Sequence, residues 1–265
     1  MRVLRVLSVD WDYFIEATME QRWLMFPDGG NEKLPPALSD TIWAARYAEH
    51  DELTKINLDK SGYNTLKKII KKLCNSQTKV FIADSHLRIY DFIKDNYKDD
   101  LLYINNIDFH HDYYYSQDGV MELNCGNWVN AIIDKDNVYN DWVNPVNVSY
   151  SWVCREDSDL SGRLEKNPQF GGYFMIEDLL KDTEDQEPYD LLFICRSSMW
   201  SPPHLDKYFF DLIKTDVVKL GADIELGFLT EDRYTDGMCK QVKEYRDFLD
   251  TAIKDLEKRR AEHDD

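Results

Sequence analysis

Three short apolar runs, each followed by acidic or histidine side chains, constrain the fold of this chain more than any other feature. The runs cover Val3–Val9, Lys79–Ala83 and Leu101–Ile107. A short apolar run bounded by polar residues is typical of a strand that is buried on both faces. Helical periodicity precedes the second run in Asn64–Leu73 and follows it in His86–Asn96. This alternation predicts an α/β fold with three layers, α/β/α, around a mainly parallel sheet.

The remainder of the chain continues the alternation less regularly. The pattern predicts a helix over Trp128–Asp134, strands over Val146–Cys154 and Tyr189–Cys195, and amphipathic helices over Leu205–Leu220 and Gln241–Arg260. With 265 residues the chain is long enough for one sizeable domain, so we expect residues 1–265 to form a single domain. The prolines and glycines of Phe26–Pro36 predict a long surface loop beside the site described below.

The charge of the chain limits its partners. Asp and Glu outnumber Lys and Arg by 50 to 32, which gives a formal net charge of -18. Such a protein repels the phosphate backbone, so we expect no nucleic-acid partner. It attracts cations instead, including metal ions and substrates that carry Arg or Lys. A solvated acidic surface would explain the same charge equally well.

Several features predict a cytoplasmic protein. No window approaches the roughly 18 consecutive apolar residues of a membrane-spanning helix, so we expect no membrane partner. The N-terminal apolar run is too short for a secretory signal and leads directly into Asp10. The 5 cysteines are widely spaced and form no CxxC pair, which is typical of reduced thiols. The sequence leaves the oligomeric state open.

Side chains that can bind metal stand where the three apolar runs end. The carboxyl ends of parallel strands meet along one edge of a sheet, and ligand sites of α/β proteins form there. Carboxylates and imidazoles suit a divalent ion such as manganese, and zinc or iron less clearly. Four carboxylates and two imidazoles are enough for two ions that share a carboxylate and activate water. The candidate metal ligands are Asp10, Asp12, His86, Asp108, His110 and Asp112.

The segment Asp108–Asp112 carries the strongest part of this signal. Its sequence is Asp-Phe-His-His-Asp, and residues two apart on an extended chain point to one side, so its first, third and fifth side chains can converge. The other strand ends have ordinary alternatives, because an Asp-x-Asp pair also fits a turn and a lone histidine also fits a helix start. Their joint occurrence at strand ends favours a common site.

At these positions the chain resembles the arginase and deacetylase superfamily, and the ureohydrolases in particular. Those enzymes carry a DxHxD element, a separate histidine and a DxD pair at strand ends, and hold two manganese ions with them. The matching segments here are Asp108–Asp112, Asp84–His86 and Asp10–Asp12.

The resemblance distributes the six ligands over two sites and implies a cofactor of two Mn2+ per chain. It implies that Asp10 and Asp108 bridge the two ions. His86 and Asp112 then complete one site, and Asp12 and His110 complete the other.

The motif order departs from that of typical arginases. There the DxD pair follows the DxHxD element, whereas here it comes first, as in a circular permutation. This order resembles a divergent branch that includes peptide arginases, which convert arginine side chains of ribosomally made peptides to ornithine and release urea. The segments that resemble this branch are Ser8–Asp12, Asn106–His110 and Asn124–Trp128. The resemblance covers mostly residues 1–130.

A second departure concerns proton transfer. Arginases carry a histidine shortly after a Gly-Asn pair, whereas Gly126-Asn127 is followed here by Trp128 and no histidine. We take His204 as the candidate proton shuttle, with His111 as a substitute; the alternative for His204 is a surface histidine that starts a helix. Asn127 and Trp128 are candidate substrate-binding residues, although a Gly-Asn pair also fits a plain turn and tryptophan is often core.

These observations predict a dinuclear manganese hydrolase that cleaves the guanidinium group of arginine, with peptide arginine preferred over free arginine. An acidic side chain should face the guanidinium, and Asp28, Glu122 and Glu156 are equally open candidates. One alternative is a metal-dependent amide hydrolase of the deacetylase type, which needs one zinc and fewer ligands. Another is a metal-binding or peptide-binding module without catalysis, because the shuttle histidine is missing from its usual position.

Overall fold

The computed structural model of the chain describes residues 2–25, 36–98, 101–113, 123–133, 147–154, 170–173, 175–182, 186–229, 233 and 236–263. The loop expected over Phe26–Pro36 lies outside these residues, except that Pro36 begins a helix.

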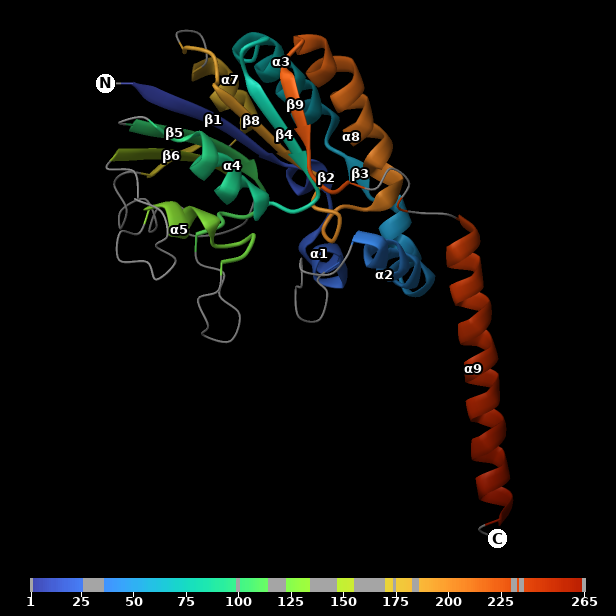
Figure 1. The fold of residues 1–265 in the computed structure, drawn as a ribbon. Helices are drawn as coiled ribbons and strands as arrows, with labels where there is room; N and C mark the ends of the chain where they lie inside the picture. Colours follow the sequence, from blue (N-terminus) through green and yellow to red (C-terminus); the bar gives the residue numbers. More distant parts are fainter. Residues whose placement is uncertain are drawn as a thin grey trace.

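The centre of the fold is a parallel sheet with the strand order β7-β6-β5-β1-β8-β4-β9, and all neighbouring strands in it run in the same direction. In chain order the strands are β1 (Val3–Asp10), β4 (Lys79–Ala83), β5 (Leu101–Asp108), β6 (Asn147–Cys154), β7 (Phe170–Tyr173), β8 (Leu191–Cys195) and β9 (Asp223–Leu226). The sheet confirms the predicted α/β class and its mainly parallel character (Figure 1).

Both faces of the sheet are buried, as β8 illustrates. All five of its residues are buried. Leu192 and Ile194 point to one face and join a core with the helices there, whereas Leu191 and Phe193 join the core on the other face. Successive side chains of a strand point to opposite faces, so a strand with helices on both sides must be apolar throughout.

One face of the sheet is covered by α3 (Lys60–Leu73), α7 (Ile176–Asp182) and α8 (Asp206–Leu212), as Figure 1 shows. The helix α3 begins at the N-cap Asp59, whose carboxylate accepts hydrogen bonds from the backbone N–H groups of Ser61 and Gly62 at 3.1 and 3.0 Å. Its apolar residues Leu66 and Ile70 recur at helical spacing and are fully buried in the core on this face.

The opposite face is covered by α4 (Arg88–Asn96) and α5 (Trp128–Ile133) (Figure 1). Ile89 and Ile93 of α4 lie one turn apart and are buried against Phe193 and its neighbours. The short helix α5 is buried at all six residues. The three layers expected from the sequence are therefore present.

Smaller elements gather at the carboxyl edge of the sheet. They are the 3-10 helix η1 (Trp11–Phe14), the antiparallel pair β2 (Ile15–Glu16) and β3 (Asn57–Leu58), α1 (Met19–Met25), α2 (Pro36–Glu49) and the 3-10 helices η2 (Asp51–Lys55) and η4 (Pro203–Leu205). The sequence pattern predicted none of them, because each is short or only weakly amphipathic.

The C-terminal part of the chain is mostly helical. After α8 the chain continues through a π-turn, η5 (Ile213–Val217), and a 3-10 turn, η6 (Val218–Leu220), which together fill the helix expected over Leu205–Leu220. The long helix α9 (Asp236–His263) extends away from the sheet in Figure 1 and packs beside α2. Arg246 of α9 donates to Glu49 of α2 at 2.8 Å.

Two further expectations concern cysteines and membranes. The cysteines whose state is described, Cys74, Cys125, Cys195 and Cys239, are free thiols, as expected. None of the described helices is long and apolar enough to cross a membrane.

The two-sided burial of β8 leads to a prediction of stability. Leu192→Ala should lower the free energy of unfolding by about 2–5 kcal/mol, because it leaves a cavity in a fully buried strand. Leu226→Ala in the edge strand β9 is the matched control; its side chain is 65 % exposed, so the change should stay within about 0.5 kcal/mol. Urea denaturation of both variants measures the difference, and equal losses would contradict the assigned core.

Candidate metal centre

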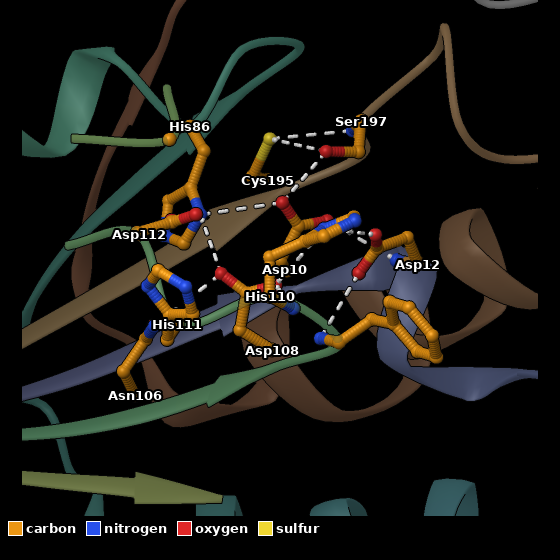
Figure 2. Close-up of polar contacts among 12 residues, drawn as sticks. Asp10, Asp12, His86, Asn106, Asp108, His110, His111, Asp112, Cys195 and Ser197 are labelled. Carbon is orange, nitrogen blue, oxygen red and sulfur yellow. Dashed lines mark hydrogen bonds and ion pairs between the residues drawn. The ribbon is translucent and has the colours of Figure 1, made fainter. Parts of the chain in front are cut away.

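The six predicted ligands come together at the carboxyl edge of the sheet. Asp10 ends β1 and Asp108 ends β5, and these strands are hydrogen-bonded neighbours. His86 follows β4, which lies two strands from β1 across β8. Figure 2 shows the carboxylates and imidazoles turned toward one another. Segments that are 98 positions apart in the chain (10 to 108) thus form one cluster, as the strand-end rule predicts.

His86 occupies the centre of one group of ligands. Its Nδ1 lies 3.2 Å from Asp10 Oδ2, 3.1 Å from Asp108 Oδ2 and 2.9 Å from Asp112 Oδ2. All four side chains are buried. Three carboxylates around one imidazole nitrogen need a positive charge between them, and in this structure a proton on Nδ1 can provide it.

His110 belongs to a second group. Its Nδ1 lies 3.2 Å from Asp12 Oδ2 and 3.9 Å from Asp108 Oδ1. The Asp12 side chain is fully buried, and its Oδ2 pairs with the His110 imidazole. Its other oxygen, Oδ1, accepts the backbone N–H of Phe109 at 3.3 Å. A fully buried carboxylate needs a compensating positive charge, so Asp12 fits a site that a protonated His110 or a bound cation neutralises.

The described side chains form two groups of possible metal ligands that share Asp108; Asp10, which the resemblance also makes a bridge, belongs to one group only, and Asp112 belongs to neither. One set of atoms that could hold an ion comes from Asp10, His86 and Asp108, and the other comes from Asp12, Asp108 and His110. Ligand atoms about 2.1 Å from one ion and at right angles to each other lie about 3 Å apart. The separations of 2.9–3.2 Å around His86 fit that spacing. The donor set therefore fits divalent ions, with Asp108 common to both groups.

The route by which the DxHxD side chains converge differs from the expected one. The strand β5 ends at Asp108, so residues 109–113 are not an extended strand. The backbone N–H of His110 donates to Asp108 Oδ1 at 2.7 Å, and the backbone of Asp112 is left-handed, with a φ of 52°. A turn therefore brings the three side chains together, and strand alternation does not.

Burial dominates the electrostatics of the carboxylates. It raises the pKa of Asp10 to about 7, with repulsion from Asp12 and Asp108 adding to the effect. It also raises the pKa of Asp108 to about 8, with help from Asp112, and the pKa of Asp112 moves in the same direction for the same cause.

The histidines and Asp12 respond to the opposite charges beside them. Burial works against protonation of both imidazoles, but the carboxylates outweigh it. They raise the pKa of His86 well above its ordinary value and that of His110 to about 9. Burial also works against ionisation of Asp12, yet its contacts with His110 and Arg22 lower its pKa. The cluster without metal therefore retains protons at neutral pH.

Further side chains hold the ligands in place. Ser8 Oγ lies 2.8 Å from His86 Nε2, so the ring nitrogen that faces the carboxylates is Nδ1. Trp128 Nε1 donates to Asp112 Oδ2 at 2.6 Å, and Asn106 Nδ2 donates to Asp108 Oδ2 at 3.3 Å. The sequence did not identify Ser8 or Asn106 as site residues. Each stands two positions before a ligand on a strand, and that spacing could have indicated them.

The remaining site predictions meet different surroundings. The fully buried Trp128 lies with its ring centroid 5.3 Å from that of His86, so it supports the ligands. Asn127 is also buried, and its Oδ1 accepts the N–H of Asn124 at 2.8 Å in the turn before α5. Contact of either residue with substrate stays a prediction. The acidic candidates Asp28, Glu122 and Glu156 lie outside the described residues.

The candidate shuttle His204 has both ring nitrogens engaged. Its Nε2 lies 2.9 Å from the carbonyl oxygen of Ile56, which can only accept, so Nε2 carries the proton. Its Nδ1 lies 2.5 Å from the Tyr47 hydroxyl and accepts from it. Burial lowers the pKa of His204. This conformation favours a structural role, and a shuttle role stays a prediction. The substitute His111 is buried too, and its Nδ1 accepts the N–H of Tyr113 at 3.0 Å.

The shifted pKa values predict how stability depends on pH in the absence of metal. Where the folded pKa exceeds the ordinary value, the folded state binds more protons than the unfolded state, so stability falls as pH rises. The stabilisation from His110 is complete below pH 6.5 and is lost by about pH 9. Asp10 and Asp108 likewise make the folded state less stable as pH rises, up to about pH 7 for Asp10 and about pH 8 for Asp108. We expect the chelator-treated protein to unfold at a lower temperature at pH 9 than at pH 6.5.

Asp108→Asn should reduce this pH dependence, because it removes one of the buried groups that titrate. Asp247→Asn makes the same substitution on the exposed surface of α9 and should leave the dependence unchanged. Thermal unfolding followed by circular dichroism measures both. If both substitutions change the pH dependence of the unfolding temperature equally, then overall charge controls that dependence and the cluster does not.

Comparisons of the chain with protein-family models, with curated proteins and with solved structures found no match. The resemblance to the arginase and deacetylase superfamily therefore rests on the sequence motifs alone. At the level that the geometry carries by itself, the centre is a buried cluster of carboxylates and imidazoles, able to hold divalent ions, at the carboxyl edge of a parallel sheet.

Proposed function

We propose that this protein is a dinuclear manganese hydrolase that cleaves the guanidinium group of arginine, in a peptide, to give ornithine and urea. The observation that carries the proposal is that two groups of carboxylates and histidines, all buried except the partly exposed His110, share Asp108. The same side chains are the ones that the ureohydrolase motifs select.

The donor set favours manganese. Asp10, His86 and Asp108, with Asp112 beside His86, would hold one ion, and Asp12, Asp108 and His110 would hold the other. Carboxylate oxygens predominate over imidazole nitrogens in both groups, which suits a hard divalent ion, and no thiolate belongs to either group. Such a pair of ions supplies a nucleophile from water at neutral pH and positive charge that stabilises the transition state.

The residues of the chain prepare this site. The Ser8 hydroxyl at His86 Nε2 fixes the ring so that Nδ1 faces the carboxylates. Trp128 covers the cluster beside His86 and excludes water from that side. Ligands held by buried partners keep their geometry through a reaction, which is the usual purpose of such contacts.

The exposure of the ligands indicates the side from which a substrate approaches. The His110 side chain is 20 % exposed, whereas that of Asp12 beside it is fully buried. The ring of Trp200 lies 5.8 Å from the ring of His110 at this more open side. An indole face attracts a flat cation such as a guanidinium, which supports an arginine side chain as the group that enters here.

Metal stoichiometry tests the first part of the proposal. The native protein, incubated with manganese and desalted, should retain about two ions per chain by elemental analysis. Asp108→Ala should lose both, because Asp108 belongs to both groups, whereas His110→Ala should retain about one. Asp59→Asn changes a buried carboxylate outside the two groups, at the N-cap of α3, and should retain both ions, which controls for the loss of a buried charge. Complete absence of bound metal in the native protein would refute the centre.

Urea release tests the second part. The manganese-loaded protein should release urea from a peptide that contains arginine, and the peptide product should contain ornithine. Asp108→Ala should lower the rate by at least about 100-fold, because it removes a ligand that both groups share. His204→Phe keeps the ring and tests the shuttle; we expect less than about tenfold loss, because both nitrogens of His204 bond to the protein.

The outcomes separate the alternatives. Release of acetate from an acetyl-lysine peptide, with one zinc bound and no urea from arginine, would favour the amide hydrolase. Tight binding of an arginine peptide that stays intact would favour a binding module. Urea must be measured directly, since loss of an acetyl group and conversion of arginine to ornithine change the nominal peptide mass equally.

A further inference from the structure

A serine that belongs to neither ligand group contacts the centre. Ser197 follows β8, and its Oγ donates a hydrogen bond to Asp10 Oδ2 at 2.7 Å. That oxygen is the one that lies 3.2 Å from His86 Nδ1. Figure 2 shows the serine above Asp10, beside Cys195 and on the side away from Asp108. The strand β8 lies between β1 and β4, so its loop reaches the cluster from a fourth strand.

The backbone of Ser197 is in a conformation that its residue type disfavours. Its φ is 51°, in the left-handed region, although serine has a Cβ atom. Only one other non-glycine residue of the described chain has a positive φ, and it is the ligand Asp112. Strained residues that persist at a site are held there by their surroundings, and they concentrate where geometry matters for function.

The loop that follows Ser197 is held by side chains from distant segments. The carbonyl oxygen of Ser198 accepts from Trp43 Nε1 at 2.7 Å and also from Arg233 Nη1. The carbonyl oxygen of Met199 accepts from Arg46 Nη1 at 2.8 Å. Trp43, Arg46 and Arg233 are all buried. Charged and aromatic donors on consecutive carbonyl groups leave this loop little freedom to relax.

Arg196, directly before Ser197, connects this loop to the segment that carries His86. Its fully buried guanidinium donates through Nε to Asp84 Oδ1 at 2.7 Å, and Asp84 stands two residues before His86. Its backbone N–H also donates to the carbonyl oxygen of Ala83 at 2.9 Å. Asp206 accepts from both Arg196 and Arg233, so the two arginines form one buried network. The loop and the His86 segment are therefore held as one unit.

We infer that Ser197 is a positioning residue of the metal centre, which fixes the carboxylate of Asp10 through its hydroxyl group. This inference rests on the proposed function, because it concerns the same centre. The strained backbone places Oγ over Asp10, and the arginine network keeps the backbone in that conformation. Among the described residues, Ser197 supplies the hydroxyl group that donates to Asp10. Without this hydrogen bond, the carboxylate of Asp10 could rotate away from the other candidate ligands.

Two substitutions at this position separate the hydroxyl from the backbone conformation. Ser197→Ala and Ser197→Gly both remove the hydroxyl, but only glycine adopts a positive φ without strain. We expect both variants to bind Mn2+ about 10–100-fold more weakly than the native protein, as is usual when a group that orients a ligand is lost. The metal-free Ser197→Gly protein should unfold at a higher temperature than the metal-free Ser197→Ala protein, because glycine relieves the strain.

Ser201→Ala is the matched control from the same loop. Ser201 is fully buried, and its Oγ donates to the carbonyl oxygen of Arg196 at 2.8 Å and not to a ligand. Its loss should lower the unfolding temperature yet change the dissociation constant of Mn2+ by less than about threefold. Electron paramagnetic resonance of free Mn2+ during a titration gives the dissociation constants, and circular dichroism gives the unfolding temperatures.

The outcomes are decisive for the inference and distinct from those for the proposed function. If Ser197→Gly binds Mn2+ as tightly as the native protein, or if Ser201→Ala weakens binding as much as Ser197→Ala, the positioning role is wrong while the centre stands. If the native protein binds no Mn2+ at all, the centre and the positioning role both fall. Weak binding in both Ser197 variants together with native-like binding in Ser201→Ala supports the inference, whether or not urea is released.

Discussion

The burial of four carboxylates beside two imidazoles at the carboxyl edge of the sheet is the constraint on which the rest of this structure depends. Like charges at these distances repel strongly in a medium of low dielectric constant. Burial accordingly raises the pKa of Asp10 and Asp108, and the neighbouring carboxylates raise that of His86. The metal-free protein balances its charge with protons, and bound cations would replace them. A cluster of this kind opposes folding unless it is neutralised, which is why we assign it to function.

The surrounding fold is organised to hold this cluster. The central strands β5, β1, β8 and β4 are adjacent, and the segments that follow them bring the ligands and Ser197 together. Apolar cores on both faces fix the strands, while Asp84, Asp206, Arg196 and Arg233 form a buried network next to the site. The positive φ angles of Asp112 and Ser197 are found at the same place. Stability from the core thus offsets strain and charge at the site.

The motif-bearing segments of the sequence and the strand ends of the fold coincide at one set of residues. The motifs select six side chains from the sequence; five of them form two groups that share Asp108, and Asp112 lies beside His86. In the folded chain His86 and His110 are separate: each imidazole contacts its own carboxylates, and Asp108 alone contacts both. That arrangement gives the cluster two places at which a cation could be held.

Five of the seven described strands of the sheet, its parallel character and the grouping of six candidate ligands at strand ends followed from the amino-acid pattern, whereas β7 and β9 did not. Apolar runs such as Val3–Val9 must be buried on both faces, and the carboxyl ends of parallel strands meet at one edge. Three features became visible only in the folded chain. They are the turn that brings Asp112 back to His86, the position of Trp128 behind the candidate ligands, and the contact of Ser197 with Asp10. Turn geometry, packing and side-chain contacts between distant segments depend on the whole fold. The periodicity of a sequence records which face a residue occupies, but it does not record which distant residue it meets.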